Sequence, residues 1–471
     1  MTQTTLIRDT NSGKQAPKSQ IALFVLCLAQ FGVVLAFQGT AVSLPEVKQA
    51  FDLSTSTSQW LVSANALAFG GLLLPAGRAA DLFGHRRLFI AGTILFGGAS
   101  LGAGLAPSVA WLIAARALQG AGAALFTPAT IALLADLFPE GAERRRALAF
   151  WGAAGPLGGV SAILLGGAVA SALGWRAVFL LGAPITFPVV FLAIMYLPAA
   201  NARLHDRLDP VGACAGALGI GVLVYGLGNL SDSALFSVRS VGCLVVATAF
   251  LGVFVSVETR SITPLIPRSL RRRGDLWRST GVAFFHGAAT NTPIVFYSLF
   301  MQRFRHATPW DIGLGFLPCN LALIAASFAG ARLAKRTRYR LVMAGVMAGL
   351  LSLTAISPNG RYIATILPGW TLVGLGVGAA QVGIVGAATE NATQAERGAI
   401  GGLVNSATQV GTAVGLALLI TISRRASGEI ESYRAAFIGA GVLALLGLIV
   451  ALSPAKGSAR FTSSPREECV R

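Results

Sequence analysis

The sequence predicts an all-α integral membrane protein, built as a bundle of fourteen transmembrane helices. Three observations lead to this fold class: few charged residues, fourteen apolar runs of membrane-spanning length, and an internal repeat. The chain has 471 residues, of which 54% are hydrophobic and 12% are charged, and its mean hydropathy is +0.68. Soluble domains carry about 25% charged residues. A soluble protein of this length is therefore excluded, because these residues cannot supply its polar surface.

The apolar runs are each close to 20 residues, the helix length that crosses about 30 Å of hydrocarbon. The expected spans are 20–43, 58–79, 88–107, 109–137, 147–171, 175–197, 209–230, 239–258, 279–302, 311–332, 340–357, 362–388, 399–422 and 434–453. Residues 1–19 and 456–471 are polar, and neither segment has an apolar core. Both are expected to be tails, and the first is not a signal peptide.

The basic residues predict the orientation of the spans. The formal net charge is +18, and 27 of the 37 Lys and Arg residues fall in the tails and loops on one side, against 9 on the other. Arg and Lys beside a span resist translocation, so the richer side is cytoplasmic. We expect a multi-pass protein of the cytoplasmic membrane with both termini in the cytoplasm. Basic residues confined to short loops also argue against a nucleic-acid partner.

Sites built on cysteine, histidine or catalytic motifs are not indicated. The five Cys residues have no CxxC spacing, and the four His residues lie far apart in the sequence. These patterns predict no disulfide framework, no metal and no cofactor. The sequence also has no phosphate-binding loop, serine hydrolase motif or zinc protease motif, so neither ATP-driven transport nor an enzymatic function is expected.

An internal repeat divides the chain. Four residues recur as the same residue type 253 positions later: Gly77, Gly92, Glu143 and Arg144. The repeat predicts two six-helix halves, 20–200 and 263–455, joined by two linking helices within 201–262. Because six is an even number, both halves have the same orientation, and parallel repeats of this kind close around a site near the middle of the membrane.

The loop after the second span carries glycines, a carboxylate and arginines at fixed spacing. Its residues are Gly77, Arg78, Asp81, Gly84, Arg86 and Arg87. Glycines allow two helices to turn tightly and to approach closely. A carboxylate can cap a helix N-terminus and pair with arginine, which makes a charge latch that breaks when two halves rock apart. We expect these residues to form a gate; the alternative is an ordinary basic loop.

The fourth span contains an arginine, Arg116, followed by Gln119. A charged side chain inside a span costs at least about 2.5 kcal/mol, so Arg116 is expected to face a wet cavity or a polar partner. The alternative is that its side chain extends to the membrane surface, because it lies only about seven residues from the start of the span.

Both motifs resemble signatures of the major facilitator superfamily, and more narrowly of its fourteen-span drug:proton antiporter branch. The resemblance covers residues 20–455. In the first motif the family pattern is G-x-L-a-D-r-x-G-r-k, and the match is weaker at Ala79, Leu82 and His85. The second motif, residues 112–124, matches the family pattern l-x-x-x-R-x-x-q-G-x-g-a-a at every defined position. The resemblance implies a major-facilitator-type bundle, a proton gradient as the energy source, and a place near the proton pathway for the fourth-span arginine.

The antiporter signature of the fifth span, G-P-x-x-G-G shortly before a Trp-Arg pair, is only partly kept. Ala162 and Ile163 replace its first glycine and its proline, although a Gly-Pro pair and further glycines occur one to two turns earlier. Faces rich in Gly and Pro allow close packing and a kink. The residues expected to pack against a neighbouring span are Gly155, Pro156, Gly159, Gly166 and Gly167.

The first span departs from the family, because related antiporters commonly have an acidic residue where this chain has Gln38. No carboxylate lies at mid-depth in any expected span. His286, in the ninth span, is the one group at mid-depth that can exchange a proton near neutral pH; the alternative is that it is a hydrogen-bonded packing residue. The candidates for the proton pathway are Arg116, Gln119 and His286.

Amide side chains within the spans are candidates for a substrate cavity. They are Gln38, Asn65, Asn291, Asn320, Gln381, Asn405 and Gln409. Buried amides need partners, which are other helices, water or a ligand. The remaining lining is apolar and aromatic, and such a cavity favours amphiphilic organic molecules over sugars or inorganic ions.

The sequence therefore predicts a secondary active transporter that exports drugs, antibiotics or other amphiphilic molecules by alternating access, driven by the proton gradient. Its expected partners are a small-molecule substrate, protons and the lipid bilayer, and we expect a monomer. Two alternatives remain: an uncoupled facilitator or uptake transporter, which Gln38 favours, and a non-transporting membrane sensor of the same fold.

Overall fold

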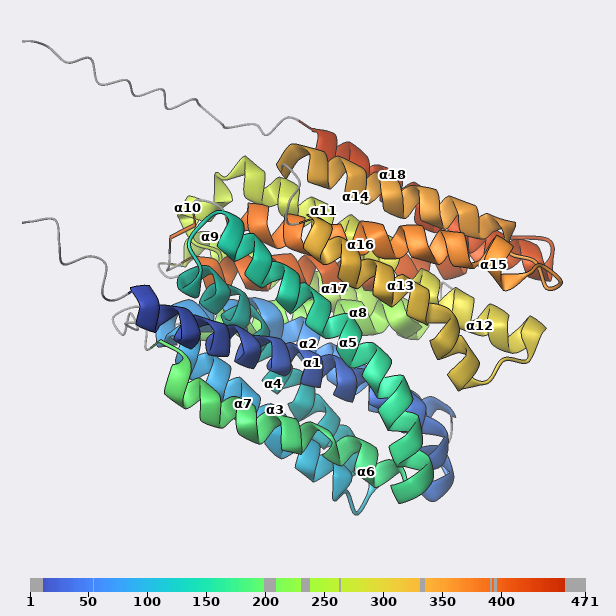
Figure 1. The fold of residues 1–471 in the computed structure, drawn as a ribbon, viewed down its shortest axis with the longest axis horizontal. Coiled ribbons are helices and arrows are strands. Elements are labelled where there is room, and N and C mark those ends of the chain that lie inside the picture. The colour runs from blue at the N-terminus through green and yellow to red at the C-terminus, as the bar shows by residue number, and fades with distance from the viewer. Residues whose placement is uncertain are drawn as a thin grey trace, which may run out of the picture.

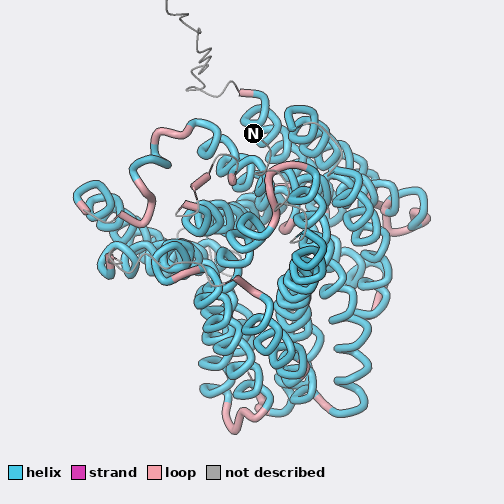
Figure 2. Tube along the Cα trace, turned by 60° about the vertical axis from the view of Figure 1, so that its left-hand side comes forward, coloured by secondary structure: helices cyan, strands magenta, loops and turns pink. Residues whose placement is uncertain are grey.

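A computed structural model of the protein describes residues 12–53, 55–198, 209–229, 238–261, 264–330, 335–389, 392–393 and 396–453. These residues form helices and no strand, which confirms the all-α prediction (Figure 2). The helices are α1 (Ser12–Ala50), α2 (Thr55–Phe83), α3 (His85–Gly104), α4 (Val109–Leu137), α5 (Ala142–Leu173), α6 (Trp175–Leu180), α7 (Gly182–Tyr196), α8 (Pro210–Asn229), α9 (Val238–Arg260), α10 (Arg268–Arg271), α11 (Gly274–Thr290), α12 (Pro293–Arg305), α13 (Pro309–Gly330), α14 (Lys335–Ser352), the 3-10 turn η1 (Leu353–Ala355), α15 (Tyr362–Thr365), α16 (Leu367–Ala388), α17 (Arg397–Arg424) and α18 (Glu429–Leu452).

Each expected span overlaps one helix or a consecutive pair of helices. Within the described residues, 11 helices are long and apolar enough to cross a membrane. Two further apolar helices, Pro210–Gly226 and Met343–Ala355, are shorter. The expected span 279–302 is broken into α11 and α12 at Asn291 and Thr292, where Pro293 lacks the N–H that a continuous helix would need.

The helices pack in two sets that repeat each other (Figure 1). In the first set α3 packs on α4, α2 on α4, and α1 on α5; in the second set α14 packs on α16, α13 on α16, and α11 on α17. These are the pairs that the 253-residue repeat relates. The linking helices α8 and α9 pack on each other, and α8 also contacts α2 and α17.

Two seams join the sets. Helix α2 packs against α17, and α5 packs against α13. The repeat also relates these two pairs, because α2 corresponds to α13 and α5 corresponds to α17. The first turn of α1 and the last turn of α18 lie at one end of the bundle, which we call the terminal end (Figure 1).

The fifth-span glycines face α1. Gly158 is the tightest, because a Cβ there would overlap the Phe31 carbonyl oxygen and come within 3.3 Å of the Leu35 amide nitrogen. At Gly155, Gly159 and Gly166 a Cβ would make ordinary contacts with α1 of 3.5 to 3.9 Å. Pro156 is half-buried within the same helix.

The prediction is wrong for Gly167, where a Cβ would have no neighbouring atom within 4 Å among the residues that the structure describes. The position lies 100° around the helix from Gly166 and so leaves the face that packs on α1.

This difference supplies a matched pair of variants. We expect Gly158→Ala to lower the midpoint of thermal unfolding, because overpacking a close helix contact typically costs about 1–3 kcal/mol. Gly167→Ala should not lower it, since the added methyl group meets open space and alanine favours helix. The measurement is thermal unfolding of the two purified variants in the same detergent. Equal midpoints would show that the α1–α5 contact adapts to a larger residue.

Candidate functional site

A cluster of buried charges joins the two halves at the terminal end, and its centre is Asp81 near the end of α2. The Asp81 carboxylate accepts hydrogen bonds from the backbone N–H groups of Gly398 (2.7 Å) and Ala399 (2.8 Å). These N–H groups belong to the first turn of α17, where the helix has no internal acceptors for them and the helix dipole favours a negative charge. Asp81 therefore caps a helix of the opposite half, 317 residues away in sequence.

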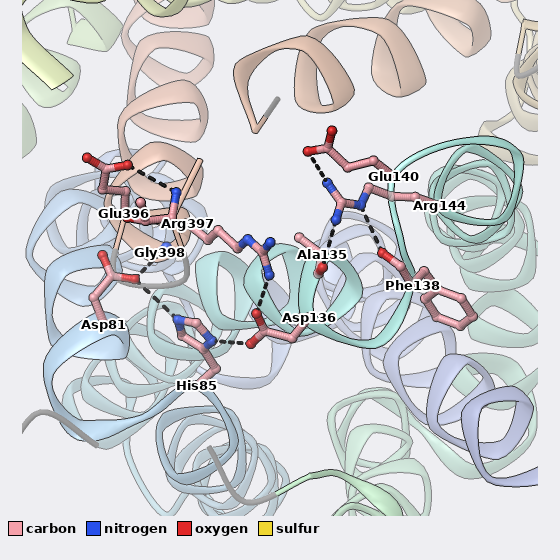
Figure 3. A network of polar contacts seen from close by, with 11 residues as sticks. Asp81, His85, Ala135, Asp136, Phe138, Glu140, Arg144, Glu396, Arg397 and Gly398 are labelled. Carbon is pink, nitrogen blue, oxygen red and sulfur yellow. Dashed lines mark hydrogen bonds and ion pairs between the residues drawn. The ribbon is translucent and has the colours of Figure 1, made fainter. Parts of the chain in front are cut away.

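The first residue of α3, His85, continues the cluster (Figure 3). Its Nε2 lies 3.2 Å from Asp81 Oδ1, and its Nδ1 lies 2.7 Å from Asp136 Oδ2 near the end of α4. The imidazole ring is 3% exposed, so this bridge is closed to solvent. The contacts of His85 and Arg397 with the two carboxylates make the cluster an ion-pair network. Among the described residues, no group of His, Cys, Asp and Glu has the arrangement of a metal site.

Asp136 makes the second link between the halves. Its other oxygen, Oδ1, accepts a hydrogen bond from Arg397 Nη1 at the start of α17. A second arginine, Arg144 of α5, donates to the carbonyl oxygens of Ala135 (2.9 Å) and Phe138 (3.0 Å) and so covers the end of α4 beside Asp136 (Figure 3). We call Asp81, His85, Asp136 and Arg397 the latch.

Glycines bring the backbones of α2 and α17 together beneath the latch. A Cβ on Gly77 would overlap the Gly398 carbonyl oxygen, and a Cβ on Gly402 would lie 2.7 Å from the Leu73 carbonyl oxygen. Only glycine permits this approach without displacing backbone. The close contact places the N-terminus of α17 within reach of the short Asp81 side chain.

The other residues of the loop motif have separate positions. Gly84 has a φ of 95°, a conformation that favours glycine, and it makes the sharp turn between α2 and α3. Arg86 donates a hydrogen bond to the Ile194 carbonyl oxygen of α7 within the same half. Arg78 is half-buried and Arg87 is exposed. The motif thus supplies the capping carboxylate, Asp81, and the turn at Gly84. The arginine of the latch, Arg397, belongs to α17 instead.

Arg116 lies deep in the first half, 1% exposed. Its Nε donates to the Leu61 carbonyl oxygen (3.0 Å), and its Nη1 donates to Gln119 Oε1 (2.7 Å). Gln119 in turn donates to Ser100 Oγ at 2.7 Å. This geometry excludes the alternative that the Arg116 side chain reaches the membrane surface.

Within the part of the chain that the structure describes, Arg116 forms no ion pair, and its Nη2 has no hydrogen-bond partner. The Phe37 and Phe179 rings, each with a centroid 6.0 Å from the guanidinium carbon, lie beside it and supply weak cation–π attraction. A buried cation without a carboxylate is costly and is usually kept for function.

The candidate cavity residues do not share one environment. Asn65 is buried and donates to the Arg116 carbonyl oxygen at 3.2 Å, so it bridges α2 and α4 rather than lining a cavity. Asn320 and Asn405 donate to carbonyl oxygens of their own helices. Gln38 is exposed on α1, and the side chain of Gln381 lies outside the described residues.

Asn291 contacts α17, and Gln409 belongs to it. Asn291 is exposed at the break between α11 and α12, and it donates to Thr412 Oγ1 of α17 at 3.0 Å. Gln409 is half-buried on α17, where its Cβ faces Gly70 of α2. Gln409 is therefore placed at the seam between α2 and α17, whereas Asn291 joins α17 to the break between α11 and α12 within the second half.

His286 is buried in α11, and its Nδ1 has no hydrogen-bond partner among the described residues. The structure brings it to neither the latch nor Arg116. Its role in proton transfer stays a prediction.

Comparisons with known proteins agree with this architecture. The family model described as Major Facilitator Superfamily matches residues 26–416 and 279–468. The puromycin resistance protein of Streptomyces alboniger is 35% identical over 422 residues, covering 87% of this chain and 83% of that protein. The cephamycin export protein of Amycolatopsis lactamdurans is 35% identical over 452 residues, covering 92% of this chain and 91% of that protein. The crystal structure of the human organic anion transporter MFSD10 (TETRAN) has the same fold, with a TM-score of 0.70 over 92% of this chain and 99% of that chain at 14% identity.

Proposed function

Since the chain belongs to the Major Facilitator Superfamily, we propose that it is a proton-driven exporter of antibiotics or other amphiphilic small molecules. It works by alternating access, in which the two halves rock about a substrate held between them. It lies in the cytoplasmic membrane as a monomer, with the terminal end in the cytoplasm. It performs no chemical step and has no nucleic-acid partner.

One observation carries this proposal beyond the family. The latch ties the halves together at one end through groups that separate without breaking either half, because the hydrogen bonds of Asp81 to α17 and of Asp136 to Arg397 all cross the seam. Such a contact is formed when the halves are closed at the terminal end and is broken when they rock apart there. The names of the relatives supply the class of substrate, since they are proteins of antibiotic resistance and export.

The proposal is tested by drug susceptibility. The chain is expressed in a host that lacks its main efflux pumps, and the minimal inhibitory concentrations of puromycin, a cephamycin and lincomycin are measured beside an empty vector. We expect at least a fourfold rise for one compound and faster efflux of that compound from preloaded cells. Unchanged susceptibility across a broad panel of amphiphilic antibiotics would contradict export.

The alternative to proton-coupled export is uncoupled facilitation. Gln38 favours it, because an amide cannot titrate. We propose proton coupling, with His286 as a candidate carrier at mid-depth. Arg116 and Gln119 are proposed to lie near the proton pathway in the first half, and Asn291 and Gln409 are proposed to contact substrate.

His286→Gln should leave substrate binding intact and flatten the pH dependence of efflux, because the amide keeps hydrogen bonding but cannot exchange a proton. The measurement is transport by purified protein in liposomes at several internal and external pH values. If wild-type transport ignores an imposed pH gradient, facilitation is the better account. If the gradient matters and the variant behaves like wild type, only the assignment to His286 is wrong.

A further inference from the structure

The latch contains a titratable side chain where the family pattern has a permanent charge. In the pattern G-x-L-a-D-r-x-G-r-k, the arginine that follows the second glycine is His85 in this chain. Arginine keeps its charge at every physiological pH, whereas the charge of an imidazole changes near neutrality. The substitution therefore adds a proton equilibrium beside the contact between the halves, because His85 contacts the two carboxylates, Asp81 and Asp136, whose hydrogen bonds cross to α17.

The hydrogen bonds define where the protons are. Asp81 Oδ1 faces the Gly398 N–H and His85 Nε2, and Asp81 Oδ2 faces the Ala399 N–H. Because both Asp81 oxygens accept from backbone N–H groups, this arrangement favours the ionised carboxylate. On the other side of the ring, Asp136 accepts from Arg397 and faces His85 Nδ1 at 2.7 Å. When both carboxylates are ionised, both ring nitrogens must donate, and only the imidazolium form does so.

With His85 protonated, the latch is electrically balanced. Asp81 and Asp136 carry negative charges from α2 and α4, and His85 and Arg397 carry positive charges from α3 and α17. Beside Asp136, Arg144 of α5 is held on backbone carbonyl oxygens at the end of α4 and on Glu140 at 3.1 Å. Beside Arg397, Glu396 accepts from Ser269 Oγ and from the Thr393 N–H at 3.1 Å. The balanced cluster is buried, with Asp81 1% and Asp136 9% exposed.

Loss of the His85 proton breaks this balance in the closed state. One ring nitrogen then presents a lone pair to a carboxylate oxygen, and the buried cluster carries an uncompensated negative charge. Removing one partner from a buried ion network is strongly destabilising. When the halves separate at this end, water reaches the carboxylates and compensates the charge, so the open state tolerates neutral His85.

We propose that His85 is a proton-binding site whose occupancy holds the halves together at the terminal end. Protonated His85 favours the closed latch, and loss of the proton as the pH rises favours the open one. For a single linked proton, the ratio of closed to open molecules falls at most tenfold per pH unit. The inference rests on the proposed function, since it names the ligand and the regulation of the same rocking step.

The test measures the distance across the terminal end. Spin labels are attached to cysteines at Ala142 and Leu452, which are exposed at the start of α5 and the end of α18, in a chain whose native cysteines are replaced. Distance distributions are recorded by pulsed electron paramagnetic resonance in lipid nanodiscs between pH 5.5 and 9. In the parent chain the short-distance population should fall as the pH rises.

Two variants at His85 should remove this dependence in opposite directions. His85→Arg keeps a permanent donor and should stay closed at every pH, whereas His85→Gln should stay mostly open. His306→Asn, at an exposed histidine at the end of α12, is the matched control and should follow the parent. A His85→Gln profile equal to that of the parent, or a parent that stays closed at all pH values, would overturn the proposal.

Efflux of the identified substrate by the same proteins separates this inference from the function it rests on. If the parent exports but its distances ignore pH, the His85 site is wrong and export stands. If the distances follow pH through His85 but no compound is exported, the proposed function fails and the proton site remains.

Discussion

Asp81→Asn is expected to reduce efflux at least tenfold while the protein still inserts and accumulates in the membrane. The carboxamide keeps the size of the side chain but loses the negative charge, and its NH2 group cannot accept the Gly398 or Ala399 N–H. In either orientation of the amide, at least one donor among Gly398 N–H, Ala399 N–H and His85 loses its acceptor. Breaking a buried charge pair costs about 3–5 kcal/mol, enough to empty the closed state of a rocking transporter.

The measurement is efflux from loaded cells, with the amount of membrane-inserted protein determined by quantitative immunoblot. Asp275→Asn is the matched control, because Asp275 is exposed and its ion pair with Arg278, at 3.0 Å, lies within its own helix. It should keep efflux within about twofold, since exposed ion pairs contribute at most about 1 kcal/mol. Undiminished efflux by Asp81→Asn would mean that the contact with α17 is dispensable.

Arg116→Ala is expected to abolish efflux, again with the protein present in the membrane. The substitution removes the donors to the Leu61 carbonyl oxygen and to Gln119 Oε1, and leaves the buried Gln119 Oε1 without its donor. Arg116→Lys should recover little, because one ammonium group cannot reproduce two N–H groups fixed in a plane.

Efflux is again measured per inserted molecule, and ligand-dependent thermal stabilisation shows whether substrate still binds. Arg425→Ala, at an exposed arginine just after α17, should behave like the parent. If Arg116→Ala transports normally, the guanidinium is a packing element and the proton pathway runs elsewhere.

The helices, and most of the fifth-span glycines that pack on a neighbouring helix, were predictable from the sequence because they depend on local composition. Apolar runs near 20 residues located the helices, and the spacing of the fifth-span glycines indicated the face that packs on α1. The break at Asn291 carried a readable signal in Pro293, which cannot donate within a helix. The error at Gly167 arose because a motif gives residue types, whereas the helix rotation decides which of two adjacent glycines meets a neighbour.

The latch partners could not be predicted, because they are brought together only by the packing of distant segments. Asp81 indicated a helix cap in general, but its acceptor role for Gly398 and Ala399 depends on a contact across 317 residues. The repeat contained a signal for Arg397, since it is the counterpart of Arg144, and Asp136 stood at the end of its span. Asn65 shows the same limit: its amide predicted a polar contact, and only the packing of α2 on α4 makes it a bridge.

The two seams between the halves differ in kind, although the repeat relates them. The counterparts of Asp81 and Asp136 in the second half are Ala334 and Thr389, so the sequence provides no second pair of latch carboxylates. Near the terminal end of the α5–α13 seam, Phe150 and Phe328 instead meet edge to face at 4.9 Å. An ion-pair contact is lost once its partners separate by a few ångströms and water enters, whereas aromatic rings tolerate small rotations without losing contact. We therefore expect an asymmetric opening: the halves should rotate about the aromatic α5–α13 seam, while the charged α2–α17 seam separates.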